Sequence, residues 1–231
     1  MPDPEQVRSM FTRIAGTYDG LNRTLSMGID QRWRKAVLRE AGELRGARVL
    51  DLCCGTGDLS RLFAQAGATV IGADFTFAMV QRAPAKLTPG GDWLFVQGDA
   101  MALPVPDASM DVVSVAFGIR NVADAERCLA EMLRVLKPGG RALVLEFPPP
   151  GRNPMGQAFR VYFRHILPRI GGLVSGDPDA YRYLPRTVLA WPAPPAFAET
   201  MAAVGFEGVR YQVMTGGIAC LHVGTRPQEG V

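Results

Sequence analysis

The chain has few residues of the types that build metal sites and disulfide frameworks. Its 231 residues include 4 cysteines and 2 histidines, and no two cysteines have the Cys-x-x-Cys spacing. Because structural zinc needs several such ligands close together, we expect no metal site. Cys53 and Cys54 are adjacent, where a bridge between them would be strained, so we expect free thiols in a reducing compartment.

Long apolar runs and a strong charge of one sign are also missing. No stretch of about 18 apolar residues is present, which predicts no membrane-spanning helix. The N-terminus carries Asp3 and Glu5 and no continuous apolar signal region. The net charge of +3 comes from 25 basic and 22 acidic residues, a balance that does not favour nucleic-acid binding. These absences predict a cytoplasmic protein, and its length and 48% hydrophobic content predict a single domain over residues 1–231.

The most informative stretch is an apolar strand that passes through Asp51, turns at Gly55 and Gly57, and ends at a second acid, Asp58. Glycines let the backbone turn sharply and let a ligand approach the main chain closely. Ser60 stands where dinucleotide-binding proteins have a third glycine, which disfavours a pyrophosphate. The two acids would repel a phosphate and tolerate a cation. The pattern therefore favours S-adenosylmethionine, which has a sulfonium and an amino group.

Acids also follow two further expected strands, at residues 68–74 and 93–97. Asp74 ends the first of these strands, and Asp99 follows the second. Ligands of open α/β sheets bind at the carboxyl edge of the strands, where three carboxylates suit a neutral or cationic adenosine cofactor. Asp74 stands where an acid accepts hydrogen bonds from ribose hydroxyls. The alternative for Asp74 is a cap of an expected helix over residues 76–82.

Strands and helices alternate along the rest of the chain. We expect helices at 59–64, 123–136 and 194–204, strands at 110–117 and 141–147, and a hairpin of 206–213 with 218–225. Lys137-Pro138-Gly139-Gly140 is expected to close the second of these helices. The alternation predicts an α/β fold with a Rossmann-like, mostly parallel seven-stranded sheet, one antiparallel strand and helices on both faces. Residues 1–44 are expected to form a helical lid, and residues 148–190 a substrate-side insertion that contacts the membrane.

Several segments together resemble the ubiquinone/menaquinone biosynthesis C-methyltransferase family of class I S-adenosylmethionine-dependent methyltransferases. The resemblance runs from about Val7 to Thr225 and rests on these segments: Met10-Phe11-x-x-Ile14-Ala15-x-x-Tyr18-Asp19-x-x-Asn22, Ser26-Met27-Gly28-Ile29, Phe117-Gly118-Ile119-Arg120-Asn121-Val122, Leu136-Lys137-Pro138-Gly139-Gly140, Leu145-Glu146-Phe147 and Tyr181-Arg182-Tyr183-Leu184. It implies methyl transfer from S-adenosylmethionine to a ring carbon of a polyprenylated hydroquinone, giving menaquinol or the ubiquinol precursor.

The resemblance also maps the family's binding positions onto Thr56, Asp74, Asp99, Ala100 and Ala116. The family often carries Asn at position 99 and Ser at position 116. Asp at position 99 keeps a polar contact, whereas Ala at position 116 loses a hydroxyl. With the residues of the turn and Phe75, the predicted cofactor-binding set is Asp51, Gly55, Thr56, Gly57, Asp74, Phe75, Asp99, Ala100 and Ala116.

The implied chemistry indicates which residues assist the acceptor. A ring carbon becomes nucleophilic when a flanking hydroxyl, with a pKa of roughly 10, loses its proton, so the site must favour the anion. Arg120 is the candidate that stabilises this phenolate, and Asn121 the one that orients the ring oxygen or a water. Tyr18 and His165 are candidates for proton handling or substrate positioning. The alternatives are a loop that merely starts the next helix for Arg120 and Asn121, a packed aromatic for Tyr18, and a helix-surface residue for His165.

Residues 151–176 contain arginines and no acid, and their apolar residues stand near helical spacing. A basic amphipathic surface of this kind is expected to contact anionic lipid at the inner face of the membrane. The alternative is that its apolar face packs against the catalytic domain. The expected partners are the prenylated quinol and a second copy of the chain or a quinone-synthesis assembly. Two other functions remain open, a methyltransferase of another small aromatic acceptor and a non-catalytic cofactor-binding scaffold.

Overall fold

One sheet organises the computed structural model, which describes residues 3–163 and 178–228. Its strands are β1 Arg48–Leu52, β2 Thr69–Asp74, β3 Trp93–Gln97, β4 Met110–Ala116, β5 Leu136–Glu146, β6 Glu207–Met214 and β7 Ala219–Thr225. Seven strands pair in the order β3-β2-β1-β4-β5-β7-β6, and β7 runs antiparallel to both of its neighbours. The predicted sheet and its terminal hairpin are therefore confirmed.

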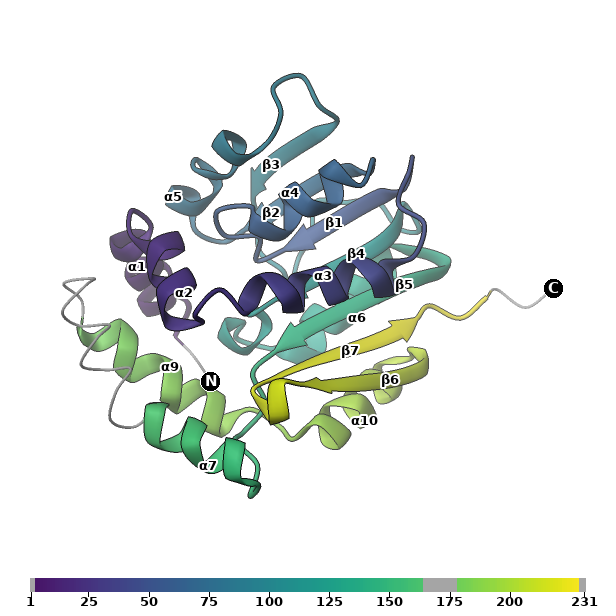
Figure 1. Ribbon diagram of the computed structural model, residues 1–231. Coiled ribbons are helices and arrows are strands. Elements are labelled where there is room, and N and C mark those ends of the chain that lie inside the picture. Colours follow the sequence, from purple (N-terminus) through teal and green to yellow (C-terminus); the bar gives the residue numbers. More distant parts are fainter. Residues whose placement is uncertain (1–2, 164–177, 229–231) are drawn as a thin grey trace.

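Helices cover both faces of this sheet (Figure 1). Their bounds are α1 Pro4–Ile14, α2 Tyr18–Leu25, α3 Asp30–Ala41, α4 Asp58–Gln65, α5 Phe77–Val80, α6 Ala125–Val135, α7 Pro154–Val161, α9 Pro178–Ala190 and α10 Pro194–Val204. Trp33 and Val37 of α3 and Phe63 of α4 join the core on one face, while Leu129 of α6 and Phe197 of α10 join the core on the other. Strands that are buried on both faces have nearly continuous apolar sequences, which explains why most residues of β4 are apolar.

Two expected elements differ from the structure. The helix expected over residues 76–82 is only the short α5, and a 3-10 turn at Ala83–Lys86 follows it, where Pro84 lacks the N–H that a longer helix needs. The Lys-Pro-Gly-Gly segment does not close α6 but lies inside β5 as a bulge. There Gly139 N donates to the Arg226 carbonyl at 3.0 Å, and Arg226 N donates to the Gly140 carbonyl at 2.9 Å. Gly139 has a φ of 76°, a conformation that favours glycine, and pairing with this C-terminal segment holds the bulge in place.

Four of the helices in the described residues gather at one end of the sheet. Figure 1 shows α1, α2, α7 and α9 beyond the arrowheads of β1 and β5, which is the edge where ligands of open α/β sheets bind. The third N-terminal helix, α3, instead packs on β5 and β7. None of the helices in the described part of the chain is both long and apolar enough to cross a bilayer.

Candidate active site

The turn after β1 has a backbone that only certain residues can adopt. Gly55 and Gly57 have φ angles of 55° and 80°. A Cβ on Gly57 would lie 3.0 Å from the Cβ of Ala83 and 3.3 Å from its Cα, so neither the conformation nor the space admits a side chain. Cys53 has a φ of 49°, which is strained for a residue with a side chain. The structure thus confirms the tight turn expected from the sequence.

Asp51, in β1, links the strand to the residues that follow the turn. Its side chain is buried, and its two carboxylate oxygens accept hydrogen bonds from Ser60 Oγ at 2.6 Å and Ser114 Oγ at 2.8 Å. Burial raises the pKa of Asp51 to about 6, although both serines favour the charged form. Ser60, which replaces the third glycine of a dinucleotide fingerprint, therefore has the structural task of holding Asp51.

A cavity of about 120 Å³ opens beside the turn, at the ends of β1, β2 and β4. Of the predicted cofactor residues, Gly55, Asp74, Phe75, Asp99, Ala100 and Ala116 line this cavity. Asp51 and Thr56 line a smaller pocket, which shares Tyr18, Cys53, Gly55 and Ala116 with the cavity. Gly57 packs against Ala83 instead. We call the 120 Å³ space the donor cavity and the smaller space beyond it the turn pocket.

Asp74 has two tasks in this arrangement. Its Oδ2 accepts a hydrogen bond from Gly55 N at 2.9 Å, and its Oδ1 accepts one from Thr76 N at 2.8 Å. The second bond is a local turn contact to Thr76, the N-cap residue of α5, which itself makes no side-chain capping bond, and the first ties β2 to the glycine turn. Burial raises the pKa of Asp74, while these main-chain hydrogen bonds lower it. Asp99 is held similarly, because its Oδ1 accepts from Met101 N at 2.9 Å.

Thr56 and Asp58 are bound by groups of the chain itself. Lys86 Nζ donates to Asp58 Oδ1 at 2.6 Å and to Thr56 Oγ1 at 2.8 Å, and it lies 2.7 Å from Asp19 Oδ2. Thr56 Oγ1 also donates to Asp19 Oδ1. The cation beside Asp58 is therefore Lys86, a partner that the sequence analysis did not identify. These contacts tie α2 to the turn after β1.

A second, larger cavity of about 330 Å³ adjoins the donor cavity. The two share Phe11, Tyr18 and Phe117, so these side chains form the boundary between them. The walls of the larger cavity are mostly apolar and come from α1, α2, α3, α7 and α9. Its aromatic lining includes Phe117 stacked on Phe147 at 4.4 Å between ring centroids. We call this space the aromatic cavity.

Arg120 lies at the aromatic cavity, on a 3-10 turn after β4. Its Nη1 donates to Glu146 Oε1 at 2.6 Å and to the Phe117 carbonyl at 2.7 Å. The two side chains are only 8% and 2% exposed. Burial raises the pKa of Glu146, whereas the charge of Arg120 lowers it. Within the described residues, Arg120 Nε and Glu146 Oε2 have no hydrogen-bond partner.

Glu146 was not assigned a role from the sequence. A signal was present, because Glu146 ends the apolar strand β5 in the same way that Asp74 ends β2. The carboxyl-edge rule that selected Asp74 and Asp99 also selects this acid.

Of the other predicted catalytic residues, Tyr18 lines the aromatic cavity together with Arg120, whereas Asn121 does not. Asn121 lines the donor cavity, and its Oδ1 is buried without a partner among residues 3–163 and 178–228. Tyr18 lines both cavities and the turn pocket, and burial raises its pKa although Asn22 hydrogen-bonds to it. The raised pKa favours the protonated Tyr18 hydroxyl, which can donate a hydrogen bond, and its part in proton handling stays a prediction. His165 lies outside the described residues.

The donor cavity fits an adenosine cofactor that carries no phosphate. Its charged lining groups are the carboxylates of Asp74 and Asp99, which can accept hydrogen bonds from hydroxyl and amino groups. The glycine turn leaves room for a ligand to approach the main chain. The adjoining aromatic cavity fits a flat, apolar ring, and Arg120 offers a fixed positive charge to an oxygen on that ring.

The chain is similar in sequence and in fold to known methyltransferases. Demethylmenaquinone methyltransferases of Thermus thermophilus and Deinococcus radiodurans are 51% and 48% identical to the chain, covering 94% and 96% of it and 100% and 93% of their own lengths. Phosphoethanolamine N-methyltransferase 2 of Haemonchus contortus, solved with S-adenosyl-L-methionine, is 16% identical and superposes with a TM-score of 0.72 over 96% of this chain and 60% of its own, which shows a shared fold. A model of the ubiE/COQ5 methyltransferase family matches residues 2–226. The chain therefore belongs to the ubiE/COQ5 methyltransferase family.

Proposed function

We propose that this enzyme transfers a methyl group from S-adenosylmethionine to a ring carbon of a polyprenylated hydroquinone, converting demethylmenaquinol to menaquinol and the matching benzoquinol to the ubiquinol precursor. The observation that supports this most is the aromatic cavity of about 330 Å³, which meets the donor cavity at Tyr18 and Phe117. A hydrophobic ring placed there lies next to the cofactor without leaving the protein.

Asp74, Asp99 and the glycine turn would hold the adenosine part of S-adenosylmethionine. When bound, this cofactor supplies an electrophilic methyl group on a positively charged sulfur. Asp74 and Asp99 keep free lone pairs, since each of their carboxylate oxygens that is bonded to the main chain accepts one hydrogen bond from it and has room for a second. Phe75 and Ala100 add apolar lining beside them.

Arg120 would stabilise the acceptor as a phenolate. Its Nη1 is committed to Glu146 and the Phe117 carbonyl, which fixes the guanidinium plane, while its Nε has no partner among the described residues. A charge held in this way needs no reorganisation when the ring oxygen loses its proton. Because the phenolate and a cationic methyl donor neutralise each other, exclusion of water by the cavity walls favours the reaction. Tyr18 would orient the ring oxygen from the boundary between the cavities, and Asn121 from the donor cavity.

Helices α1 and α2 would act as the lid over this site. Phe11 and Tyr18 from these helices separate the two cavities, and their rings meet edge to face at 6.1 Å between centroids. The Lys86 contacts with Asp19 and Asp58 hold α2 against the turn. Opening of this lid is one route for the cofactor to enter.

A face around the aromatic cavity would contact the membrane peripherally. Met27 and Met155 line the cavity and are 82% and 48% exposed, and Val161 on α7 is 56% exposed. Arg152 and Arg160 are exposed on the same segment, whereas the arginines at 164 and 169 lie outside the described residues. Apolar side chains beside arginines suit an anionic lipid surface, from which a prenylated quinol can enter the cavity. A homodimer or a quinone-synthesis assembly stays a prediction.

The membrane contact can be tested by flotation with vesicles. Val161→Ser should reduce the fraction that floats with anionic vesicles, because it removes an exposed apolar side chain from this face. Val213→Ser is the matched control, since Val213 is 50% exposed on the edge strand β6. Equal flotation of wild type and Val161→Ser would contradict the proposed face.

The proposed reaction is tested by mass-resolved methyl transfer. Wild-type enzyme with isotopically labelled S-adenosylmethionine is given reduced demethylmenaquinone in lipid vesicles and, in parallel, the matching demethylated benzoquinol. A ring product carrying the labelled methyl supports the proposal and ranks the two rings. Cofactor binding without product from either ring would contradict it and favour another aromatic acceptor or a non-catalytic scaffold.

A further inference from the structure

Arg34 is a buried arginine that the proposed reaction does not yet use. It lies on α3, its side chain is 10% exposed, and it lines both the turn pocket and the aromatic cavity. Its guanidinium stands over the Phe117 ring, with 5.7 Å from Cζ to the ring centroid. Burying a charge costs free energy unless a partner compensates it, so its partner matters.

The described residues give Arg34 only a weak partner. Its Nε lies 3.6 Å from Asp30 Oδ2, which is beyond hydrogen-bond distance, and this Nε has no hydrogen-bond partner within residues 3–163 and 178–228. The two Asp30 oxygens accept hydrogen bonds from Ser26 Oγ at 2.8 Å and Gln31 Nε2 at 2.9 Å. Each Asp30 oxygen thus already accepts a shorter hydrogen bond from another donor, and Arg34 Nε keeps its hydrogen for a further anion.

The other charged groups around the turn pocket are already paired. Asp51 accepts from two serines, and Asp58 accepts from Lys86. Among the described residues, Arg34 is the positively charged one that lines the turn pocket, and neither Lys nor Arg lines the donor cavity. An anionic group that reaches the turn pocket would therefore meet the Arg34 guanidinium.

The continuity of the two spaces identifies this anionic group. Tyr18, Gly55 and Ala116 line both the donor cavity and the turn pocket, so a ligand with its adenosine beside Asp74 continues past Gly55 toward Arg34. The part of S-adenosylmethionine beyond its sulfur ends in an ammonium and a carboxylate. We infer that Arg34 binds the carboxylate of S-adenosylmethionine. The inference rests on the proposed function, in which S-adenosylmethionine is the methyl donor.

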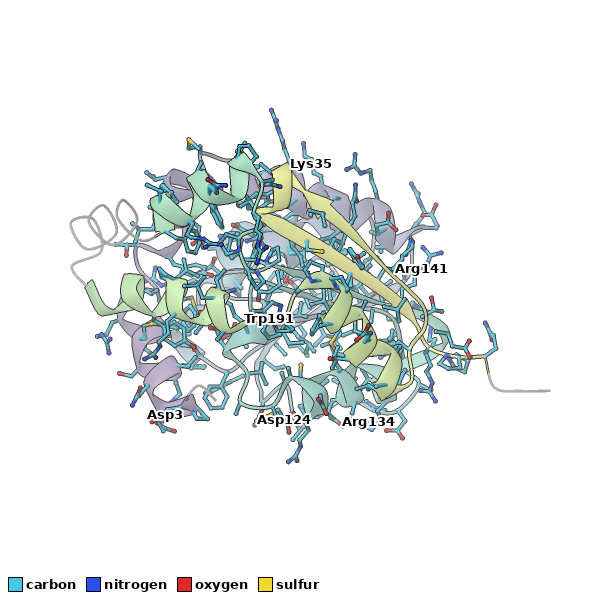
Figure 2. The ribbon with its side chains drawn as sticks, turned by 90° about the horizontal axis from the view of Figure 1, so that it is seen from below. Asp3, Lys35, Asp124, Arg134, Arg141 and Trp191 are labelled. Carbon is cyan, nitrogen blue, oxygen red and sulfur yellow. The ribbon has the colours of Figure 1, made fainter. Side chains whose placement is uncertain are left out.

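Isothermal titration calorimetry without any acceptor tests this inference. The two probes are S-adenosylmethionine and decarboxylated S-adenosylmethionine, which differ only in the carboxylate. Wild-type protein should bind the first about 10- to 100-fold more tightly, the range expected for a hydrogen-bonded charge pair. Arg34→Met should remove this difference by weakening only the first probe. Lys35→Met is the matched control, since Lys35 is exposed one residue further along α3 and lies at the outer surface in Figure 2, and it should leave both affinities unchanged.

Arg34→Lys guards against a folding defect in Arg34→Met, because it keeps the charge and loses the planar donors. It should retain part of the preference for S-adenosylmethionine. Equal affinity of wild-type protein for the two probes would overturn the inference, as would an equal loss of both affinities in Arg34→Met. A loss confined to the KM of the quinol would overturn it too and place Arg34 at the acceptor instead. Failure of wild-type protein to bind either probe would contradict the proposed function itself.

Discussion

The donor cavity and the aromatic cavity are built in different ways. The donor cavity lies at strand ends, where main-chain groups of a glycine turn and the acids Asp74 and Asp99 face the ligand. The aromatic cavity is enclosed by side chains of helices and of the segments that join them to the sheet, and these residues are far apart in the sequence, from Met10 to Ile218. The first kind of site follows from a local motif, whereas the second requires the tertiary packing. Changes in the two cavities should therefore separate cofactor binding from acceptor chemistry.

Substitution of Arg120 should lower turnover strongly without changing the affinity for the cofactor product. Arg120→Met combined with Glu146→Gln should lower turnover by about 100- to 1,000-fold, because the fixed charge that stabilises the phenolate is lost. The affinity for S-adenosylhomocysteine should change little, since Arg120 lines only the aromatic cavity of the two. The second substitution avoids an unpaired buried carboxylate. Single-turnover kinetics and calorimetry measure the two quantities, and near-normal turnover would remove Arg120 from the mechanism.

On the donor side, Asp51 should make stability depend on pH. Its pKa is about 6 when folded and near 3.8 when unfolded, so the folded state holds the proton more tightly. Raising the pH through the window from about 4 to 6 therefore destabilises the wild type relative to Asp51→Asn, by about 2 to 3 kcal/mol. Urea unfolding at pH 4, 5, 6 and 7 measures this difference. A constant difference between the two proteins would show that the Asp51 pKa is the same in both states.

Asp74→Asn should lower the affinity of the donor cavity for its ligand and leave quinol binding in the aromatic cavity unchanged. The amide retains one acceptor oxygen for the glycine turn but loses the charge, so we expect the affinity for S-adenosylhomocysteine to fall about 10-fold. The KM for the quinol should stay within about twofold at saturating cofactor. Asp92→Asn is the control, because Asp92 is an exposed acid. A rise in quinol KM as large as the loss of cofactor affinity would contradict the division between the cavities.

The smallest effect concerns the aromatic wall. Phe159 packs on Phe163 at 4.2 Å between ring centroids, and Phe159→Leu removes part of this apolar surface. We expect the KM for a long-prenyl quinol to rise about fivefold, which corresponds to about 1 kcal/mol of lost burial. The affinity for S-adenosylhomocysteine should not change. Steady-state kinetics with quinols of two prenyl lengths check this result, and a matching loss of cofactor affinity would count against the assignment of the wall to the acceptor.

The sequence predicted the features of the site that depend on nearby residues. Gly55, Asp74 and Asp99 follow strands at positions where the parallel sheet places them together, so the motif and the order of strands were sufficient. The bulge at Gly139 was not predicted, because it depends on pairing with Arg226 at the other end of the chain.

The unpredicted parts of the site depend on packing between distant elements. Lys86 reaches Asp19 of α2 from a turn after α5, and Glu146 reaches Arg120 across the ends of β4 and β5. The sequence alone indicates that Arg34 is a further charged residue on an amphipathic helix. Its burial against Phe117 in the structure distinguishes it from the exposed Lys35. His165 stays a prediction, because it lies outside the described residues.

The two adjoining cavities should hold the methyl donor and the quinol separately. A crystal structure of the protein with S-adenosylhomocysteine and a short-prenyl demethylmenaquinol tests it most directly. We expect density for adenosine beside Asp74 and Asp99, and density for the ring between Phe117 and Arg120 with one ring oxygen at the guanidinium. Ring density in the donor cavity, or bound on the surface away from Arg120, would contradict the claim.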